Sequence, residues 1–244
     1  LFSKKGEAGA DGMSSFQALA TAIAAQVGTG NIAGAATALA IGGPGAIFWM
    51  WIAAFLGMAT IYAEAIMAQK YKTVGADGQV TGGPVYYIRA AFKGTFGKVL
   101  AGIFAILITL ALGFMGNAVQ SNSIAASFHT AFGIPQWIMG LVVAVIAIFV
   151  FMGGMKRIAK VTETIVPFMA ALYIIGSLIV IIYNYKNIPY AFASIFIGAF
   201  SPSSVVGGAA GATVKLALTK GVARGLFSNE AGMGSTPHAH AVAK

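Results

Sequence analysis

Long apolar stretches separated by short polar ones dominate this chain, and they predict helices that span a membrane. A helix needs roughly 20 apolar residues to cross the hydrocarbon of a bilayer. We expect six segments, at about 14–41, 45–69, 99–131, 136–153, 161–185 and from near Gly211 onward. Polar, glycine-rich breaks interrupt the first and the last of them.

Two connecting stretches have a different character. Residues 73–98 are glycine-rich and too polar to span, and we expect a short interfacial helix within them. Residues 183–200 are aromatic and indicate an interfacial segment rather than another span.

The composition agrees with a membrane protein. Hydrophobic residues make up 58% of the 244 and charged residues only 9%, against about a quarter in typical soluble domains. The mean hydropathy is +0.84. The net charge of +9 does not predict nucleic-acid binding, because most of the basic residues cluster between the apolar stretches. The first residues lack the layout of a signal peptide.

The positions of the basic residues predict an orientation. If Lys4 and Lys5 are cytoplasmic, alternation places residues 70–98 and 154–160 inside, as the positive-inside rule expects. Residues 42–44 and 132–135 then lie outside and carry no Lys or Arg. The exceptions are cations placed toward the outside, and we expect three of them to line a water-filled vestibule: Lys215, Lys220 and Arg224.

The first break is VGTGNIAG, residues 27–34, which has three glycines within seven residues. Each glycine inside a helix costs about 1 kcal/mol relative to alanine, so we expect the helix to unwind here. Unwound N–H and C=O groups need partners inside a bilayer. The N-terminus of a half-helix suits a carboxylate, and exposed carbonyls suit a cation. Close helix packing through the Gly30/Gly34 pair is the alternative explanation.

The second break is SNEAGMGS, residues 228–235, which places a glutamate and an asparagine inside a span. Such residues are expensive in hydrocarbon and are therefore functional candidates. A loop between two short interfacial helices is the alternative. The two breaks lie five helices apart, and paired broken helices in two halves of a chain indicate a transporter site.

Polar residues in the third segment support a cavity. Asn117, Gln120 and Ser121 share one helical face by their spacing, whereas Asn122 is assigned to interhelical hydrogen bonding. Elsewhere the ionisable groups are isolated. Glu64 either caps N–H groups of a broken helix or reaches toward the interface.

The sequence also argues against a metalloprotein, an enzyme and a channel. His238 and His240 are interpreted as structural, the chain has no cysteine, and no metal site is expected. We find no set of nucleophile, base and orienting group, so an enzyme is not expected. A channel is the runner-up, but its filter is usually a repeated ring, and the two breaks differ in sequence.

At its breaks the chain resembles the alanine or glycine:cation symporter family. The matching strings are VGTGNIAGAATALAIGGPGAIFWMW, TGGPVYYI, GNAVQSNSI and GVARGLFSNEAGMGS, within a resemblance that runs from about residue 14 to the end. It implies an all-α membrane protein with a LeuT-type fold of two five-helix inverted repeats. It also implies import of alanine or glycine with sodium, sometimes with protons, across the plasma (inner) membrane.

The resemblance also implies a division of the chain. Residues 1–13 are expected to be a cytoplasmic stretch, 14–185 the first repeat, 186–210 an extracellular interfacial segment, and 211–244 the first broken helix of the second repeat. The chain does not begin with Met and stops directly after a motif. We therefore expect a fragment that lacks the family's leading helix and last four helices.

The predicted binding residues follow from the breaks and the resemblance together. Carbonyls of Ala24 and Val27, with Asn31, are expected to form part of the sodium site, and no other cofactor is expected. The absence of a mid-membrane aspartate favours sodium over protons. Small residues at the breaks predict a pocket that prefers alanine and glycine to leucine. Residues expected to surround the substrate are Gly28, Thr29, Gly30, Asn31, Gln120, Ser228, Asn229, Glu230, Ala231, Gly232 and Met233.

Overall fold

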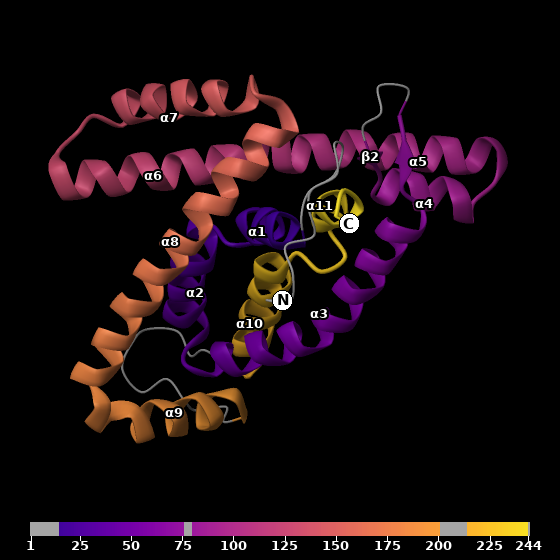
Figure 1. The fold of residues 1–244 in the computed structure, drawn as a ribbon. Coiled ribbons are helices and arrows are strands. Elements are labelled where there is room, and N and C mark those ends of the chain that lie inside the picture. Colours follow the sequence, from indigo (N-terminus) through magenta and orange to yellow (C-terminus); the bar gives the residue numbers. More distant parts are fainter. Residues whose placement is uncertain (1–14, 76–79, 201–213, 244) are drawn as a thin grey trace. The chain divides into compact units, whose positions relative to one another are not determined.

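Helices form almost the whole of the described chain (Figure 1). The structure is a computed structural model, and it describes residues 15–75, 80–200 and 214–243. In chain order the elements are α1 (Ser15–Gln26), α2 (Thr29–Gly42), α3 (Gly45–Lys70), β1 (Thr73–Val74), β2 (Val80–Thr81), α4 (Pro84–Ala91), α5 (Gly94–Ile108), the π-helix η1 (Thr109–Gly116), α6 (Asn117–Phe132), α7 (Gln136–Phe151), α8 (Gly154–Tyr183), the 3₁₀ turn η2 (Tyr185–Asn187), α9 (Ile188–Phe200), α10 (Val214–Asn229) and α11 (Thr236–Ala241).

Three helices of the described chain are long and apolar enough to cross a membrane, at Gly45–Lys70, Gly94–Phe132 and Lys156–Tyr183. The second of them is continuous through α5, η1 and α6. A shorter apolar helix occupies Gln136–Phe151. This is an all-α membrane architecture, while the count of six segments stays a prediction.

The chain divides into two compact units. The first unit comprises residues 1–29, 62–167 and 233–244, and the second comprises 30–61 and 168–232. Their boundaries fall in the two predicted breaks, within α3 and at Pro167 inside α8.

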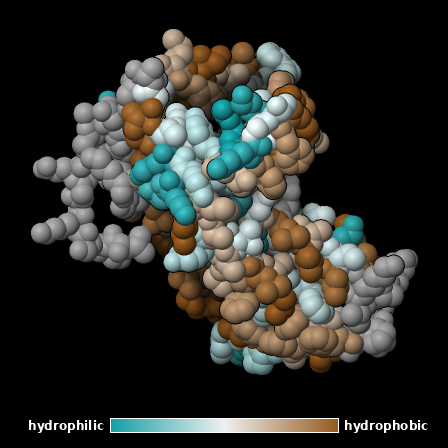
Figure 2. Space-filling view, turned by 90° about the vertical axis from the view of Figure 1, so that its right-hand side faces the viewer, coloured by the Kyte–Doolittle hydropathy of each residue, from teal (hydrophilic) through white to brown (hydrophobic). Residues whose placement is uncertain are grey.

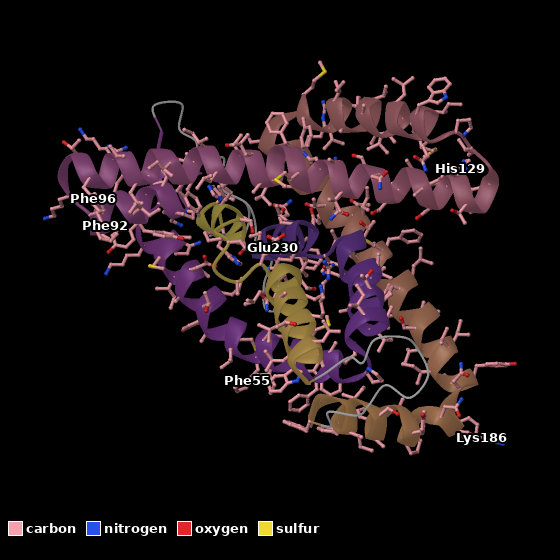
Figure 3. All side chains as sticks on the ribbon, turned by 180° about the vertical axis from the view of Figure 1, so that it is seen from behind. Phe55, Phe92, Phe96, His129, Lys186 and Glu230 are labelled. Atoms are coloured by element: carbon pink, nitrogen blue, oxygen red, sulfur yellow. The ribbon has the colours of Figure 1, made fainter. Side chains whose placement is uncertain are left out.

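In the first unit the helices pack as pairs. α1 packs against α11, α4 against α5, and α6 against α7; the last pair runs side by side in Figures 1 and 3. The start of α8 is held to α1 by polar contacts. Gln17 Nε2 donates to Glu163 Oε2 at 2.9 Å, and the hydroxyls of Thr21 and Thr162 lie 3.2 Å apart.

In the second unit, glycines allow α10 to lie directly on α3. A Cβ at Gly221 would lie 2.4 Å from the carbonyl oxygen of Ala46, and one at Gly225 would lie 2.7 Å from the Cβ of Ala53. Close approach through small residues is how membrane helices commonly associate. The GVARG string is therefore a packing motif, which the sequence analysis did not identify.

The predicted segments agree with the helices except at three places. The third and fifth segments begin earlier than predicted, at Gly94 and Gly154, because their first turns are polar but still helical. The stretch 73–98 contains the expected short helix, α4, and also the two-residue strands β1 and β2, which were not expected. The cytoplasmic stretch 1–13 and residues 201–213 lie outside the described residues.

Candidate functional site

The first predicted break is present. α1 ends at Gln26, its last backbone bond runs from the N–H of Val27 to the carbonyl of Ile23 at 2.7 Å, and α2 begins at Thr29. The ends of an α-helix leave N–H and C=O groups that have no partner within the helix. Here one helix ends and another begins within three residues. The carbonyls of α1 and the N–H groups of α2 thus meet at one place in the sequence.

Gln120, on α6, holds this break. Its Oε1 accepts hydrogen bonds from both the backbone N–H and the hydroxyl of Thr29, at 3.1 and 2.6 Å. A Cβ at Gly28 would lie 2.3 Å from Gln120 Nε2, so only glycine leaves room for the amide in this position. The structure thus brings Gln120 to Gly28 and Thr29, although Gln120 lies 91 residues from Thr29 in the sequence.

A π-helix precedes Gln120 in the same span. η1 covers Thr109–Gly116 and ends one turn before Gln120. π-helical turns are rare and are often found at functional sites. At the two ends of η1 side chains bond to the backbone of their own helix, from Thr109 Oγ1 to the Ala105 carbonyl at 2.8 Å and from Asn117 Nδ2 to the Gly113 carbonyl at 2.9 Å. The Asn117 amide, predicted to face a cavity, therefore bonds within its own span.

The second break is also present, and its backbone is unusual. α10 ends at Asn229 and α11 begins at Thr236. Between them Glu230, Gly232 and Gly234 have φ angles of 53°, 83° and 78°. A left-handed conformation is uncommon for residues other than glycine. At Glu230 it indicates a backbone shape that the surrounding structure imposes.

Asn229 shapes this break from the α10 side. Its Oδ1 accepts a hydrogen bond from the N–H of Ala231 at 2.9 Å, which forms the local turn, and its Nδ2 lies 3.5 Å from the carbonyl oxygen of Ala53 on α3. A Cβ at Gly57 would lie 2.8 Å from the same Nδ2. The amide is thus held between the break and α3.

The C-terminal side of the second break, from Gly234 into α11, is held by contacts within the first unit. Gly234 lies between Phe104 and Pro84, where a Cβ would approach their side chains to 2.6 and 2.7 Å. Gln69 Nε2, at the end of α3, donates to the carbonyls of His240 and Ala243, and Lys72 Nζ donates to Gln69 Oε1 and to the Ala243 carbonyl. These bonds satisfy carbonyls at the C-terminus of α11.

Three further titratable residues, His238, Glu64 and Tyr87, lie on α11, α3 and α4. His238 Nδ1 lies 3.2 Å from the carbonyl oxygen of Ser235, at the start of α11. Glu64 is buried, with 6% of its surface exposed. Burial raises the pKa of Tyr87 on α4 to about 12, and the nearby charge of Glu64 adds to the effect. Tyr87 is therefore a neutral hydrogen-bond donor over the physiological range.

The remaining predicted residues belong to one unit or the other. Ala24, Val27, Gly28, Thr29, Gln120 and Met233 lie in the first unit, and Gly30, Asn31, Ser228, Asn229, Glu230, Ala231 and Gly232 lie in the second. Within the first unit Gln120 contacts the first break, and within the second unit Asn229 contacts its own break. The assembly of both sets into one substrate pocket stays a prediction.

Several residues that shape the breaks were missed by the sequence analysis. Ala53 and Gly57 support Asn229, Gln69 and Lys72 hold α11, and η1 precedes Gln120. Gly57 is an isolated glycine within an apolar run, which is a weak signal of close packing. The contacts of Gln69 and Lys72 depend on residues more than 170 positions away, so no local pattern reveals them.

Comparison with known proteins identifies a matching family and several related sequences. The family model described as "Sodium:alanine symporter family" matches residues 1–244. The chain is 48% identical to "Sodium/alanine symporter AgcS" of Methanococcus maripaludis, covering 100% of this chain and 53% of that protein. It is 45% identical to "Amino-acid carrier protein AlsT" of Bacillus subtilis, covering 96% and 49%. It is 46% identical to "Probable sodium/glutamine symporter GlnT" of Bacillus subtilis, covering 95% and 47%. The chain thus spans about half the length of these curated relatives.

Proposed function

Because the chain belongs to the sodium:alanine symporter family, we propose that it forms part of a carrier that imports alanine or glycine together with sodium. The family consists of cation-coupled amino-acid symporters, and the helical architecture is that of a membrane protein. We propose the plasma membrane as the location and a LeuT-type inverted repeat as the fold of the full-length protein.

The first helix break and its contact with Gln120 carry the proposal. The N-terminal turn of α2, at Gly30 and Asn31, offers N–H groups and the positive end of a helix dipole to the substrate carboxylate. The C-terminal turn of α1 offers the carbonyls of Ala24 and Val27 to a sodium ion. Gln120 fixes the short link between these two half-helices through Thr29.

The second break supplies the other wall of the proposed pocket. We assign Ser228–Met233 to the substrate, and Glu230 is the one acidic residue in the sequences of the two breaks, 27–34 and 228–235. Asn229 holds this break in shape through Ala231. Because the breaks offer the small residues Gly28, Gly30, Ala231 and Gly232, the pocket should exclude larger side chains by steric contact. A single methylene changes affinity by only about 1–3 kcal/mol, so the exclusion is strongest for leucine.

Equilibrium binding of labelled alanine to the purified full-length protein tests the proposal. We expect sodium-dependent binding, competition by glycine, and loss of binding in Gly30→Leu and Asn31→Ala. Gly102→Ala serves as the control, because a Cβ at this position meets nothing within 4 Å. Normal binding by both variants of the first break would rule out this substrate site.

Two uptake measurements on membrane vesicles that contain the full-length protein separate the alternatives. Replacing sodium by choline abolishes uptake by a sodium-coupled carrier, whereas uptake that continues and follows an imposed pH gradient indicates proton coupling. Unlabelled glutamine and leucine are added as competitors, since one relative is named for glutamine. Competition by leucine as strong as that by alanine would contradict the small pocket.

A further inference from the structure

The tight turn between α4 and α5 is rich in basic and aromatic residues that have no role in the proposed substrate and sodium sites. Arg89, Phe92, Lys93, Phe96 and Lys98 surround this turn, and we call these five residues the α4–α5 corner. All of them belong to the first unit. The corner includes the last residues before the candidate span Gly94–Phe132 and the first turn of that span, which places it at a membrane boundary.

The geometry of the turn fixes the corner as a compact structure. The N–H of Phe92 donates to the carbonyl of Ile88 at 2.9 Å and ends α4, and Gly94 takes a φ of 79°. Gly97 lies against the Phe92 carbonyl so closely that a Cβ would overlap it. The two helices therefore pack closely at the turn, and the side chains of the corner are held on its outside.

Two aromatic rings are exposed at the corner. Phe92 and Phe96 are 47% and 65% exposed, and their ring centroids lie 5.6 Å apart at an interplanar angle of 81°. Figure 3 shows both side chains at the outer edge of this turn. Exposed phenylalanines beside basic residues are typical of helices that lie in the headgroup region of a membrane.

The charged residues of the α4–α5 corner itself are all basic. Arg89, Lys93 and Lys98 are all exposed, and Asp77 is the only acidic residue of the sequence between Glu64 and Glu163. Figure 2 faces the side of the molecule on which α4 and α5 meet, and hydrophilic surface gathers in its upper half amid hydrophobic surface. Cations clustered beside a membrane span bind anionic lipids.

We propose that the α4–α5 corner is a binding surface for anionic phospholipid headgroups. Arg89, Lys93 and Lys98 contact the lipid phosphates, and Phe92 and Phe96 enter the boundary between headgroups and acyl chains. Lys70 closes the preceding span at the same membrane face, with its Nζ 5.5 Å from the centre of the Tyr71 ring. The surface favours an anionic lipid over a soluble anion, because a lipid offers a phosphate to the cations and an acyl chain to the rings, whereas a soluble anion offers only the charge.

Lipid retention by the full-length protein tests the charges. The protein is equilibrated with phosphatidylcholine containing graded phosphatidylglycerol, and bound lipid is counted by native mass spectrometry. The triple variant Arg89→Gln, Lys93→Gln and Lys98→Gln should need at least about tenfold more phosphatidylglycerol for half-saturation. The control neutralises two exposed cations that the predicted orientation places toward the other face, Lys186→Gln and Lys220→Gln, and should shift far less. Equal retention by both variants would overturn the proposal.

Competition identifies the kind of anion. Millimolar inorganic phosphate should leave the bound phosphatidylglycerol in place, as should an acidic peptide at the same charge concentration. Displacement by phosphate would instead identify a site for a soluble anion, and displacement by the peptide would identify a protein-binding surface. Either result would overturn the assignment to lipid.

A second measurement, photo-crosslinking to lipids, leaves the basic residues of the corner in place. A photo-crosslinking amino acid replaces Phe96 in the full-length protein, which is then placed in bilayers of phosphatidylcholine and phosphatidylglycerol in equal amounts. We expect crosslinks to phosphatidylglycerol to exceed those to phosphatidylcholine severalfold. The same replacement at Phe132, an exposed ring at the other end of the span, should show no such preference. Equal labelling of both lipids at position 96 would contradict the proposal.

Discussion

A single amide on α6 defines the shape of the first helix break. Gln120 Oε1 accepts both hydrogen bonds that Thr29 offers, and the missing side chain of Gly28 leaves the space that the amide occupies. The hydroxyl bond is the shorter one, at 2.6 Å. A bond of this kind contributes roughly 0.5–1.5 kcal/mol net, and more when its loss leaves a polar group unsatisfied.

Thr29→Val should therefore weaken substrate binding while the protein still folds. Valine has the shape of threonine but lacks the hydroxyl donor, so the bond from the backbone N–H to Gln120 alone remains. We expect about a five- to tenfold rise in the dissociation constant for alanine, corresponding to about 1 kcal/mol. The measurement is equilibrium binding at saturating sodium.

Thr29→Ser is the matched control for this change. Serine keeps the hydroxyl and should bind alanine within about twofold of the unchanged protein, since the bond to Gln120 is retained. If valine and serine variants bound alanine equally well, the Thr29–Gln120 contact would have no part in shaping the site.

At the scale of the elements, glycines differ in whether the space beside them can hold a side chain. α10 meets α3 through Gly221 and Gly225, where there is no room for a side chain. The face of α5 at Gly102 is open, and a Cβ there would meet nothing within 4 Å. Glycine is therefore required at the first contact, whereas at Gly102 it only lowers helix propensity.

Gly221→Ala should destabilise the protein, because the added methyl group would overlap the backbone carbonyl of Ala46. Overpacking typically costs about 1–3 kcal/mol. Gly102→Ala should be neutral or stabilise by up to about 1 kcal/mol, as helix propensity predicts. Thermal unfolding of both full-length variants in one detergent measures the difference. A melting temperature that is equal in the two variants would contradict the packing described here.

The sequence was sufficient to predict the breaks but not what holds them. Glycines and intramembrane polar residues made interruptions within 27–34 and 228–235 predictable, because their cost is local. The interruptions themselves are shorter, at residues 27–28 and 230–235, and Gly30 and Gly34 are helical. The contacts of Gln120 with Thr29 and of Gln69 with His240 join residues 91 and 171 positions apart. Such contacts depend on tertiary packing, which no local pattern contains.

Other elements were missed for local reasons. The π-helix η1 has the same apolar composition as the α-helix before it, so hydropathy alone does not distinguish them. The strands β1 and β2 are two residues each, too short to show alternation. The first two turns of α8 carry Lys156, Arg157 and Lys160, and for that reason they were not assigned to the fifth segment.

At the scale of the whole molecule, one helix fixes how the chain crosses the membrane. The span through α5, η1 and α6 is 39 residues long, or about 58 Å at 1.5 Å per residue. A bilayer is about 40–45 Å thick including its headgroups. We therefore expect the two ends to emerge on opposite sides. The basic residues at its start, Lys93 and Lys98, predict that this end lies in the cytoplasm.

This orientation predicts opposite chemical accessibility at the two ends of the span. Thr95 and Gln136 are both exposed and flank the helix, and the described sequence has no cysteine of its own. In a full-length protein without other cysteines, a membrane-impermeant maleimide should label Gln136→Cys in intact cells. It should label Thr95→Cys only after the membrane is permeabilised, because the cations beside Thr95 hold that end inside. Labelling of Thr95→Cys in intact cells would reverse the orientation, and it would move the α4–α5 corner to the outer leaflet.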